Sequence, residues 1–347
     1  MSLTEREILD TPRALERTCR YFGERRERHR AFFAETARRK FVFLGCGSSY
    51  MLAKSAAAFF ASLPETSAVA VPAGDYLLAP AFWQEPLREA VVVTFSRSGR
   101  TSEMVQAVRH IRATAGDPVV SICTAAEGES ELAAFCAVEI ALDWCYDESV
   151  CQTRTVTNFY AASLLLAAAY RGDERLEDEV RRACQGCGDF QQKYREALTA
   201  LAAQPWDNAV VLADGPLCGI AEEGALAFTE ISMLIGRYFH VLDYRHGPIV
   251  VSGERTLTVM ALRPDEEKLQ RAMAADVLAK GGPVVTVSAQ AGNPWESTLA
   301  LQIEGVREFA AWGVQFIYVC QMLALQKALV RGGNPDRPQG LDPYIVL

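Results

Sequence analysis

The chain has 347 residues, of which half are hydrophobic and 22% are charged, and its formal net charge is −8. This length can bury a large core and allows two domains. The negative charge argues against a nucleic-acid surface, although local hydrogen-bond donors could still hold a small anionic ligand. Residues 1–40 hold many Arg and Glu and no apolar block, so we expect no signal peptide.

Ten cysteines are spread through the chain without the spacing of a small disulfide scaffold, which predicts a reduced, cytoplasmic protein. Cys184 and Cys187 have CxxC spacing, but a zinc site needs a second ligand pair, and the four histidines offer no matching spacing. We therefore expect plain thiols and no bound metal. The apolar run 159–170 is too short to span a bilayer, which predicts a buried helix and no membrane contact.

Strands and helices alternate along the chain in the predicted order. Residues 1–36 are charged helices, and a helical stretch over 155–203 connects two halves. The strand-turn-helix units and short strands of the first half cover 40–63, 68–78, 89–111, 117–136 and 137–142. Those of the second half cover 208–234, 255–278 and 282–303. Such alternation is typical of a parallel sheet with helices on both faces.

The spacing of these units predicts an internal repeat. The first two strands are about 50 residues apart in each half and the next about 27, so the halves repeat with an offset of roughly 165 residues. We expect an N-terminal helical segment (1–36), a first α/β domain (37–190), a second (200–331) and a C-terminal tail (332–347). The last helix, near residues 312–332, is apolar enough to be buried against the sheet or a second subunit.

Two turns carry many hydrogen-bond donors. GCGSSY (45–50) and SRSGRTSE (96–103) each follow a strand and open a helix, where a parallel sheet binds its ligands. Free N–H groups and the helix dipole favour an anion there. The glycines let the backbone come close, and Arg100 could add charge. We therefore predict a phosphate site, whose side chains are Ser48, Ser49, Ser96, Arg97, Ser98 and Thr101.

Helix capping and nucleotide binding fit these two turns less well than a phosphate site does. Ser and Thr are common helix N-caps, but five hydroxyls over two turns exceed what capping needs. A dinucleotide would require GxGxxG and a later acid, and a Walker loop would require GK[ST]; neither pattern is present.

Together, GCGSSY and SRSGRTSE resemble the sugar isomerase (SIS) domain, the phosphosugar-binding module of glucosamine-6-phosphate synthase and related proteins. The repeat then implies two tandem SIS domains, each a mainly parallel three-layer αβα sandwich. The segment 147–165, the helix EEGALAFTEIS (222–232) and YRHGP (244–248) are also similar to this family. The resemblance covers about residues 35–347 and implies a phosphorylated sugar substrate, no cofactor and a tail that reaches the active site.

The resemblance also implies the catalytic residues. Glu223 and Glu230 lie two helical turns apart on one face, and His246 precedes a Gly-Pro turn. Glu230 matches the family base that moves a proton between C1 and C2, and His246 matches the histidine that helps open the sugar ring. In relatives this histidine comes from a neighbouring subunit, which implies a homodimer. Lesser substrate contacts are expected at Gly47, Val150, Thr153 and Glu223.

Two departures from the family narrow the expected activity. Relatives of the synthase type carry lysines where this chain has Ala227 and, near the C-terminus, about Pro343. The chain also carries no glutaminase domain, so glutamine-dependent synthesis is not expected. The site is more similar to fructosamine-6-phosphate deglycases and amino-sugar-phosphate deaminases, whose substrates supply the nitrogen themselves.

Three alternatives stay open. A simple aldose–ketose isomerase would use the same residues. A phosphosugar sensor without activity would need an output module, and residues 1–36 are too short and too evenly charged for one. A nicotinamide enzyme on a doubly wound sheet rests on fold analogy alone.

Overall fold

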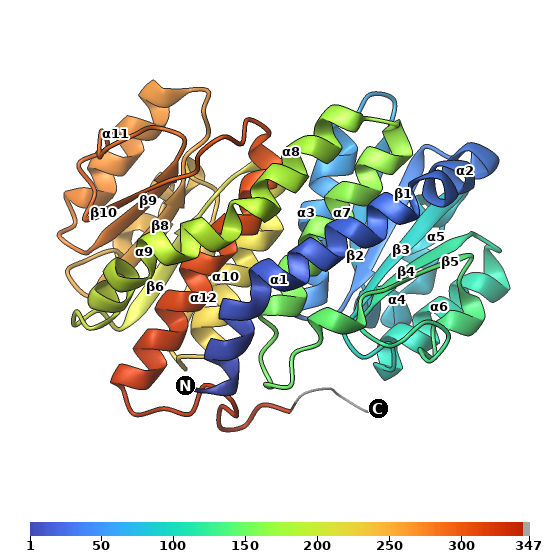
Figure 1. Cartoon of the computed structure of the whole chain (residues 1–347), viewed down its shortest axis with the longest axis horizontal. Coiled ribbons are helices and arrows are strands. Elements are labelled where there is room, and N and C mark those ends of the chain that lie inside the picture. The colour runs from blue at the N-terminus through green and yellow to red at the C-terminus, as the bar shows by residue number, and fades with distance from the viewer. Residues whose placement is uncertain (343–347) are drawn as a thin grey trace.

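The computed structural model describes residues 1–342 and contains two parallel five-stranded sheets flanked by helices (Figure 1). The first sheet has the strand order β2-β1-β3-β4-β5 and the second has β10-β9-β8-β6-β7. Taken from its other edge, the second order is β7-β6-β8-β9-β10, which repeats the first. The structure therefore confirms two tandem α/β domains of the predicted class.

The domains use corresponding elements. The first contains β1 (Lys40–Gly45), α3 (Ser48–Ser62), β2 (Ser67–Pro72), α4 (Ala73–Leu78), α5 (Gln84–Leu87), β3 (Ala90–Ser96), α6 (Ser102–Thr114), β4 (Val119–Cys123) and β5 (Val138–Ala141). The second contains β6 (Asn208–Leu212), α10 (Cys218–Glu230), β7 (Ile235–Phe239), β8 (Thr256–Ala261), α11 (Glu267–Leu278), β9 (Val284–Ser288), β10 (Leu299–Gln302) and α12 (Gly313–Val330). The remaining long helices are α1 (Leu3–Glu24), α2 (Arg26–Thr36), α7 (Arg154–Arg171), α8 (Glu174–Gln185) and α9 (Cys187–Ala202).

Alternating strand residues bury their side chains on opposite faces of the first sheet. Phe41 and Phe43 of β1 belong to a core cluster that includes α3 and α7, whereas Val42 and Leu44 belong to one that includes α4 and α6. Both faces are covered, so the strand is apolar at nearly every position. The first cluster also contains residues of the second sheet, so one core joins the domains.

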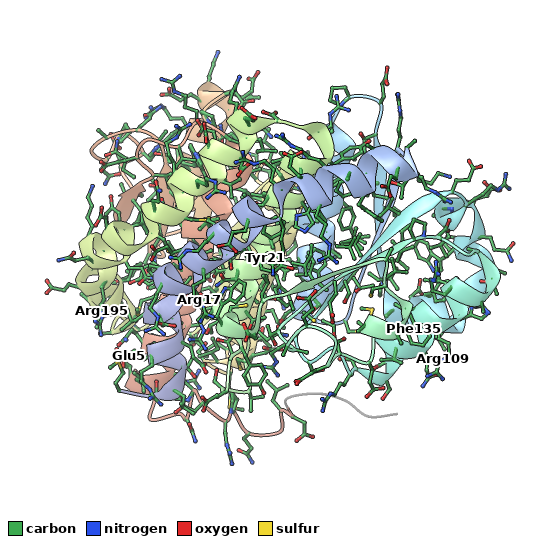
Figure 2. All side chains as sticks on the ribbon, turned by 45° about the vertical axis from the view of Figure 1, so that its right-hand side comes forward. Glu5, Arg17, Tyr21, Arg109, Phe135 and Arg195 are labelled. Carbon is green, nitrogen blue, oxygen red and sulfur yellow. The ribbon has the colours of Figure 1, made fainter. Side chains whose placement is uncertain are left out.

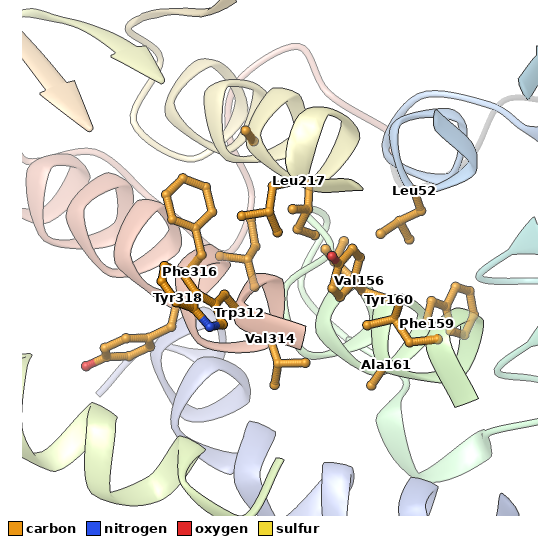
Figure 3. Close-up of a cluster of buried hydrophobic side chains, with 14 of the residues drawn as sticks. Leu52, Val156, Phe159, Tyr160, Ala161, Leu217, Trp312, Val314, Phe316 and Tyr318 are labelled. Atoms are coloured by element: carbon orange, nitrogen blue, oxygen red, sulfur yellow. The ribbon is translucent and has the colours of Figure 1, made fainter. Parts of the chain in front are cut away.

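The centre of this shared core is formed by helices from both halves of the chain. Figure 3 shows Leu52 of α3, Phe159 and Tyr160 of α7, and Phe316 of α12 meeting there. The Tyr160 hydroxyl donates to the carbonyl of Ala310, 2.6 Å away. The two sheets are thus held in one arrangement by packed helices rather than by a flexible linker.

Helix α12 is apolar around its whole circumference because it is surrounded by protein. The segment Phe309–Val330 is the one helix of the described residues long and apolar enough to cross a membrane, but 83% of its apolar window is buried inside the protein. It packs against α9 and α10. It is therefore buried within its own chain, but chiefly against other helices rather than against the sheet as the sequence predicted.

Helix α1 runs across both domains (Figures 1 and 2). Near its start, Glu5 pairs with Arg195 of α9 at 2.7 Å, and α9 contacts the second sheet through Tyr194 and Gln302. Near its end, the Tyr21 hydroxyl donates to the carbonyl of Glu139 in β5. The N-terminal helix therefore fastens the two domains together, which its charged sequence did not reveal.

Candidate active site

A cavity of about 300 Å³ lies at the carboxyl ends of β1 and β3. All six side chains predicted to bind phosphate line it, namely Ser48, Ser49, Ser96, Arg97, Ser98 and Thr101. Gly47, Val150 and Glu230 line it as well. The cavity thus brings two turns of the first domain together with one carboxylate from the second.

The turn after β1 is tight because it passes through glycine. A Cβ on Gly45 would lie 2.3 Å from the carbonyl oxygen of Ser49, so a larger residue would push α3 away. The N–H groups of Ser49 and Tyr50 already donate to carbonyls within the turn. The Ser49 hydroxyl therefore remains as a side-chain donor for a ligand at this end of α3, whereas the Ser48 hydroxyl is bonded to Glu223.

The turn after β3 uses its serines as both acceptors and donors. The Ser96 oxygen accepts the N–H of Gly99 at 3.1 Å, and the Ser98 oxygen accepts that of Arg100 at 3.2 Å. Each hydroxyl proton is then available for another acceptor. Thr101 stands at the N-cap of α6, but its side chain makes no capping hydrogen bond. Capping therefore does not account for this hydroxyl.

Arg97 braces a neighbouring loop and brings positive charge to the cavity. Its side chain is 8% exposed, and Nη1 donates to the carbonyls of Ser149 and Val150, each at 3.1 Å. This contact fixes residues 147–153, which we call the site loop. The loop contributes Val150 and Gln152 to the cavity wall.

Glu230 is the last residue of α10 and faces this charge. Burial raises the pKa of the Glu230 carboxyl above its usual value, while a hydrogen bond from Cys151 and the charge of Arg97 partly oppose this rise. A carboxylate with a raised pKa is a stronger base than an exposed one. Cys151, at the centre of the site loop, is 2% exposed.

Glu223 lies two turns before Glu230 on α10 and is fully enclosed, away from the cavity wall. Burial, and next the charge of Glu230, raise the pKa of Glu223 well above its usual value, whereas a hydrogen bond with Ser48 lowers it. These effects favour the neutral acid. Ala227, between them in sequence, is buried and adds no charge.

His246 lies in a different part of the molecule. It follows the short helical turn Asp243–Arg245 and is exposed, beyond the edge strand β7. It does not line the cavity of its own chain. That His246 helps to open the sugar ring in the site of a neighbouring subunit stays a prediction.

Other predicted positions make internal contacts. Thr153 is 0% exposed, and its N–H and hydroxyl donate to Asp147 at 2.8 and 3.3 Å, so a direct substrate contact there also stays a prediction. Cys184 and Cys187 are free thiols buried in the core. Gly340, Leu341 and Asp342 of the tail line the cavity, whereas Pro343 lies outside the described residues.

Several residues at the site were not singled out from the sequence. Cys46, Gln152 and Met104 contribute to the wall, and Cys151 contacts Glu230. Cys46 lies inside a recognised motif, so position alone could have found it. The site loop offered no local pattern. An open groove of about 980 Å³ adjoins the cavity and is lined partly by Arg100, Arg109 and Arg337; Figure 2 labels Arg109 beside Phe135.

Comparison with known proteins bears on the family and the fold of the chain. Residues 36–169 match the family model of the SIS domain. The chain is 26% identical to glutamine–fructose-6-phosphate aminotransferase [isomerizing] of Legionella pneumophila over 335 residues, covering 92% of this chain and 54% of that protein. The chain thus spans about half the length of these curated relatives.

Two further comparisons extend over whole chains. D-galactosamine-6-phosphate deaminase AgaS of Escherichia coli is 24% identical over 358 residues, covering 96% of this chain and 91% of that one. The structure of tagatose-6-phosphate ketose/aldose isomerase from Escherichia coli superposes with a TM-score of 0.87 at 20% identity, covering 99% and 96%. The latter likeness shows that the fold is shared across both domains.

Proposed function

We propose, because residues 36–169 match the model of the SIS domain, that this chain is an enzyme acting on a phosphorylated amino sugar, or on an adduct of a sugar phosphate with an amine. The reaction is an aldose–ketose type proton shift followed by release of the amine. The observation that carries this proposal is that Glu230 opens on the same cavity as the hydroxyls of both turns. One ligand could therefore place its anion at the turns and its carbonyl end near a carboxylate.

The chain's residues divide the proposed work between them. The hydroxyls of Ser49 and Thr101 and the charge of Arg97 bind the phosphate group. Glu230 then takes a proton from one of the carbons C1 and C2 and returns it to the other. For an amino-sugar substrate this shift turns the C–N bond into an imine. Water adds to the imine carbon, and the amine leaves with the proton it gains.

The raised pKa of Glu230 supports its role as a base. Burial brings the titration of this carboxyl closer to neutrality. Proton transfer by a positioned carboxylate is most effective when its pKa approaches the working pH. Glu223, held as a neutral acid, adds no second negative charge beside the proposed intermediate.

Amine release is proposed over glutamine-dependent synthesis and over simple isomerisation, on one ground each. Position 227 is an alanine, so α10 offers no amine at the place where relatives of the synthase type carry a lysine. The amino-sugar-phosphate deaminase relative also matches nearly full length. The likeness to the tagatose-6-phosphate isomerase keeps plain isomerisation as the second candidate.

We also propose that the protein acts in the cytoplasm as a homodimer in which His246 enters the partner's cavity. The support is a set of exposed apolar side chains on the segment 233–250, which includes the edge strand β7 and this histidine. Met233, Ile235 and Val250 are 55%, 60% and 79% exposed. Apolar side chains gathered at an unpaired sheet edge are typical of a protein interface.

The proposal is tested by incubating the protein with hexose 6-phosphates, amino-hexose 6-phosphates and 6-phosphorylated fructosamines. NMR then follows the products, the loss of C1 and C2 protons to deuterated solvent, and free amine. Release of ammonia or amine supports the proposal, whereas conversion without release supports the isomerase. Binding without proton exchange in any compound would overturn the enzyme assignment in favour of a sensor.

A further inference from the structure

Two of the segments that line the candidate cavity are attached to α1, a helix that contributes no residue to the cavity wall. One is the site loop defined above. The other is the tail segment 336–342, whose residues 340–342 line the cavity. In Figure 1 the chain's N-terminus and this tail lie side by side below both domains.

The tail is attached at Asp336. Its carboxylate accepts the N–H of Leu3 at 3.0 Å, the N–H of Thr4 at 2.8 Å and the Thr4 hydroxyl at 2.8 Å. Thr4 is 0% exposed, and its hydroxyl also lies 3.0 Å from the carbonyl of Pro335. Burial opposes ionisation of Asp336, but these hydrogen bonds lower its pKa below the usual value. A charged acceptor at a helix N-terminus is a strong attachment point.

The site loop is attached one helical turn further along. The Glu7 carboxylate accepts the N–H groups of Glu148 and Ser149, at 2.6 and 3.2 Å, and also the Ser149 hydroxyl. The tail and the loop are bonded to each other as well, since the N–H of Val150 donates to the Asp336 carbonyl at 3.2 Å. The carbonyls of Ser149 and Val150 then reach Arg97 at the cavity.

We propose that the first two turns of α1 are a latch that holds the tail and the site loop over the cavity. Thr4, Glu7 and Asp336 are then positioning residues, because none of them lines the cavity. The role in substrate binding rests on the proposed function; the mechanical role does not. A network of buried, mutually satisfied hydrogen bonds has one preferred geometry, so loss of one member loosens the others.

The latch is tested through Cys46, a half-buried thiol of the cavity wall. Burial raises the pKa of this thiol to about 11, so we expect displacement of the tail and the site loop to increase both its access to solvent and its thiolate fraction. The ligand-free protein is treated with N-ethylmaleimide at pH 8, and the labelling rate is followed by peptide mass spectrometry. In Thr4→Val we expect Cys46 to react roughly tenfold faster, about the factor for one lost hydrogen bond to a charged group; Asp336→Ala loses three such bonds and should raise the rate at least as much.

Matched controls separate the latch from general loosening. Thr4→Ser keeps the hydroxyl and restores the slow rate. Glu5→Gln alters the same turn of α1, but Glu5 pairs with Arg195 rather than with the tail or the loop, so its rate stays that of the parent. Cys136 and Cys218, also half-buried and outside the cavity wall, serve as internal references and keep their rates in every variant. An unchanged Cys46 rate in folded Thr4→Val, or an equal rise at all three thiols, overturns the proposal.

Kinetics with an accepted sugar phosphate provide the second readout. We expect Thr4→Val to raise KM roughly tenfold with kcat nearly unchanged, and Thr4→Ser to restore KM. A variant that merely unfolds would lose kcat and thermal stability instead. Should the parent protein convert no sugar phosphate, the proposed function fails, while the labelling experiment still decides the latch.

Discussion

The carboxyl of Glu223 in the second domain is hydrogen-bonded to the hydroxyl of Ser48 in the first. This contact joins the helix that carries the proposed base to the turn that carries the proposed phosphate site. Other contacts reinforce the same junction: Lys54 pairs with Glu222 at 2.7 Å, and the Ser55 hydroxyl accepts the N–H of Ile220 at 2.8 Å. The distance from phosphate to base is thus set by how α3 packs against α10.

That packing depends on a glycine, which gives the first prediction. A Cβ on Gly219 would lie 1.9 Å from the carbonyl oxygen of Met51 and 2.6 Å from the N atom of Ser55. Gly219→Ala must separate α3 from α10, so we expect a loss of about 2–3 kcal/mol in the free energy of unfolding. Chemical denaturation measures this loss. Gly74→Ala is the matched control, because a Cβ there meets nothing within 4 Å in helix α4; parent-like stability of Gly219→Ala would contradict the packing argument.

The second prediction concerns the hydroxyls of the turns. Ser49→Ala or Thr101→Val removes one donor facing the cavity, and a hydrogen bond to a charged group contributes about 1.5–3 kcal/mol. We therefore expect KM for an accepted sugar phosphate to rise tenfold or more, with kcat reduced much less. The control is Thr114→Val, which removes a hydroxyl that donates to the backbone carbonyl of His110 within α6. A fall in kcat with unchanged KM would show that these hydroxyls act on the reacting carbons instead.

The third prediction concerns pH. Glu230 works as a base only when ionised, so kcat/KM should rise with pH through its pKa, which burial places above that of an ordinary glutamate. The hydrogen bond from Cys151 stabilises the ionised form and lowers this pKa. Cys151→Ala removes the donor, so the acidic limb of the profile should move to higher pH. Cys151→Ser retains a donor and should not move the limb upward; a downward move in Cys151→Ala would refute the assignment.

The sequence predicts those features that depend on residues close together along the chain. Strands β1 and β3 and their turns were predicted because burial on both faces makes a run of apolar residues, and a glycine-rich turn follows directly. Edge strand β7 and helix α4 were not predicted. Ile235 of β7 is 60% exposed, so this strand lacks a run of buried apolar residues, and α4 has only six residues. The contact between Thr4 and Asp336 spans nearly the whole chain, so no local pattern announces it.

The final prediction tests whether the active site is shared between subunits. The sequence pairs His246 with the site only through resemblance, and the structure places it on an exposed loop outside its own cavity. Glu230→Gln alone should lower kcat by roughly 10²- to 10⁴-fold, as expected for loss of a general base, and His246→Ala should also be nearly inactive.

If each cavity takes the histidine of its partner, a mixed dimer of the two variants contains one intact site of two. Unfolding and refolding the variants together in equal amounts should then restore about a quarter of the parent activity, because half of the dimers are mixed. Each variant refolded alone is the control, and light scattering checks the dimer. No recovery in a mixture that does form mixed dimers would place His246 outside the partner's site.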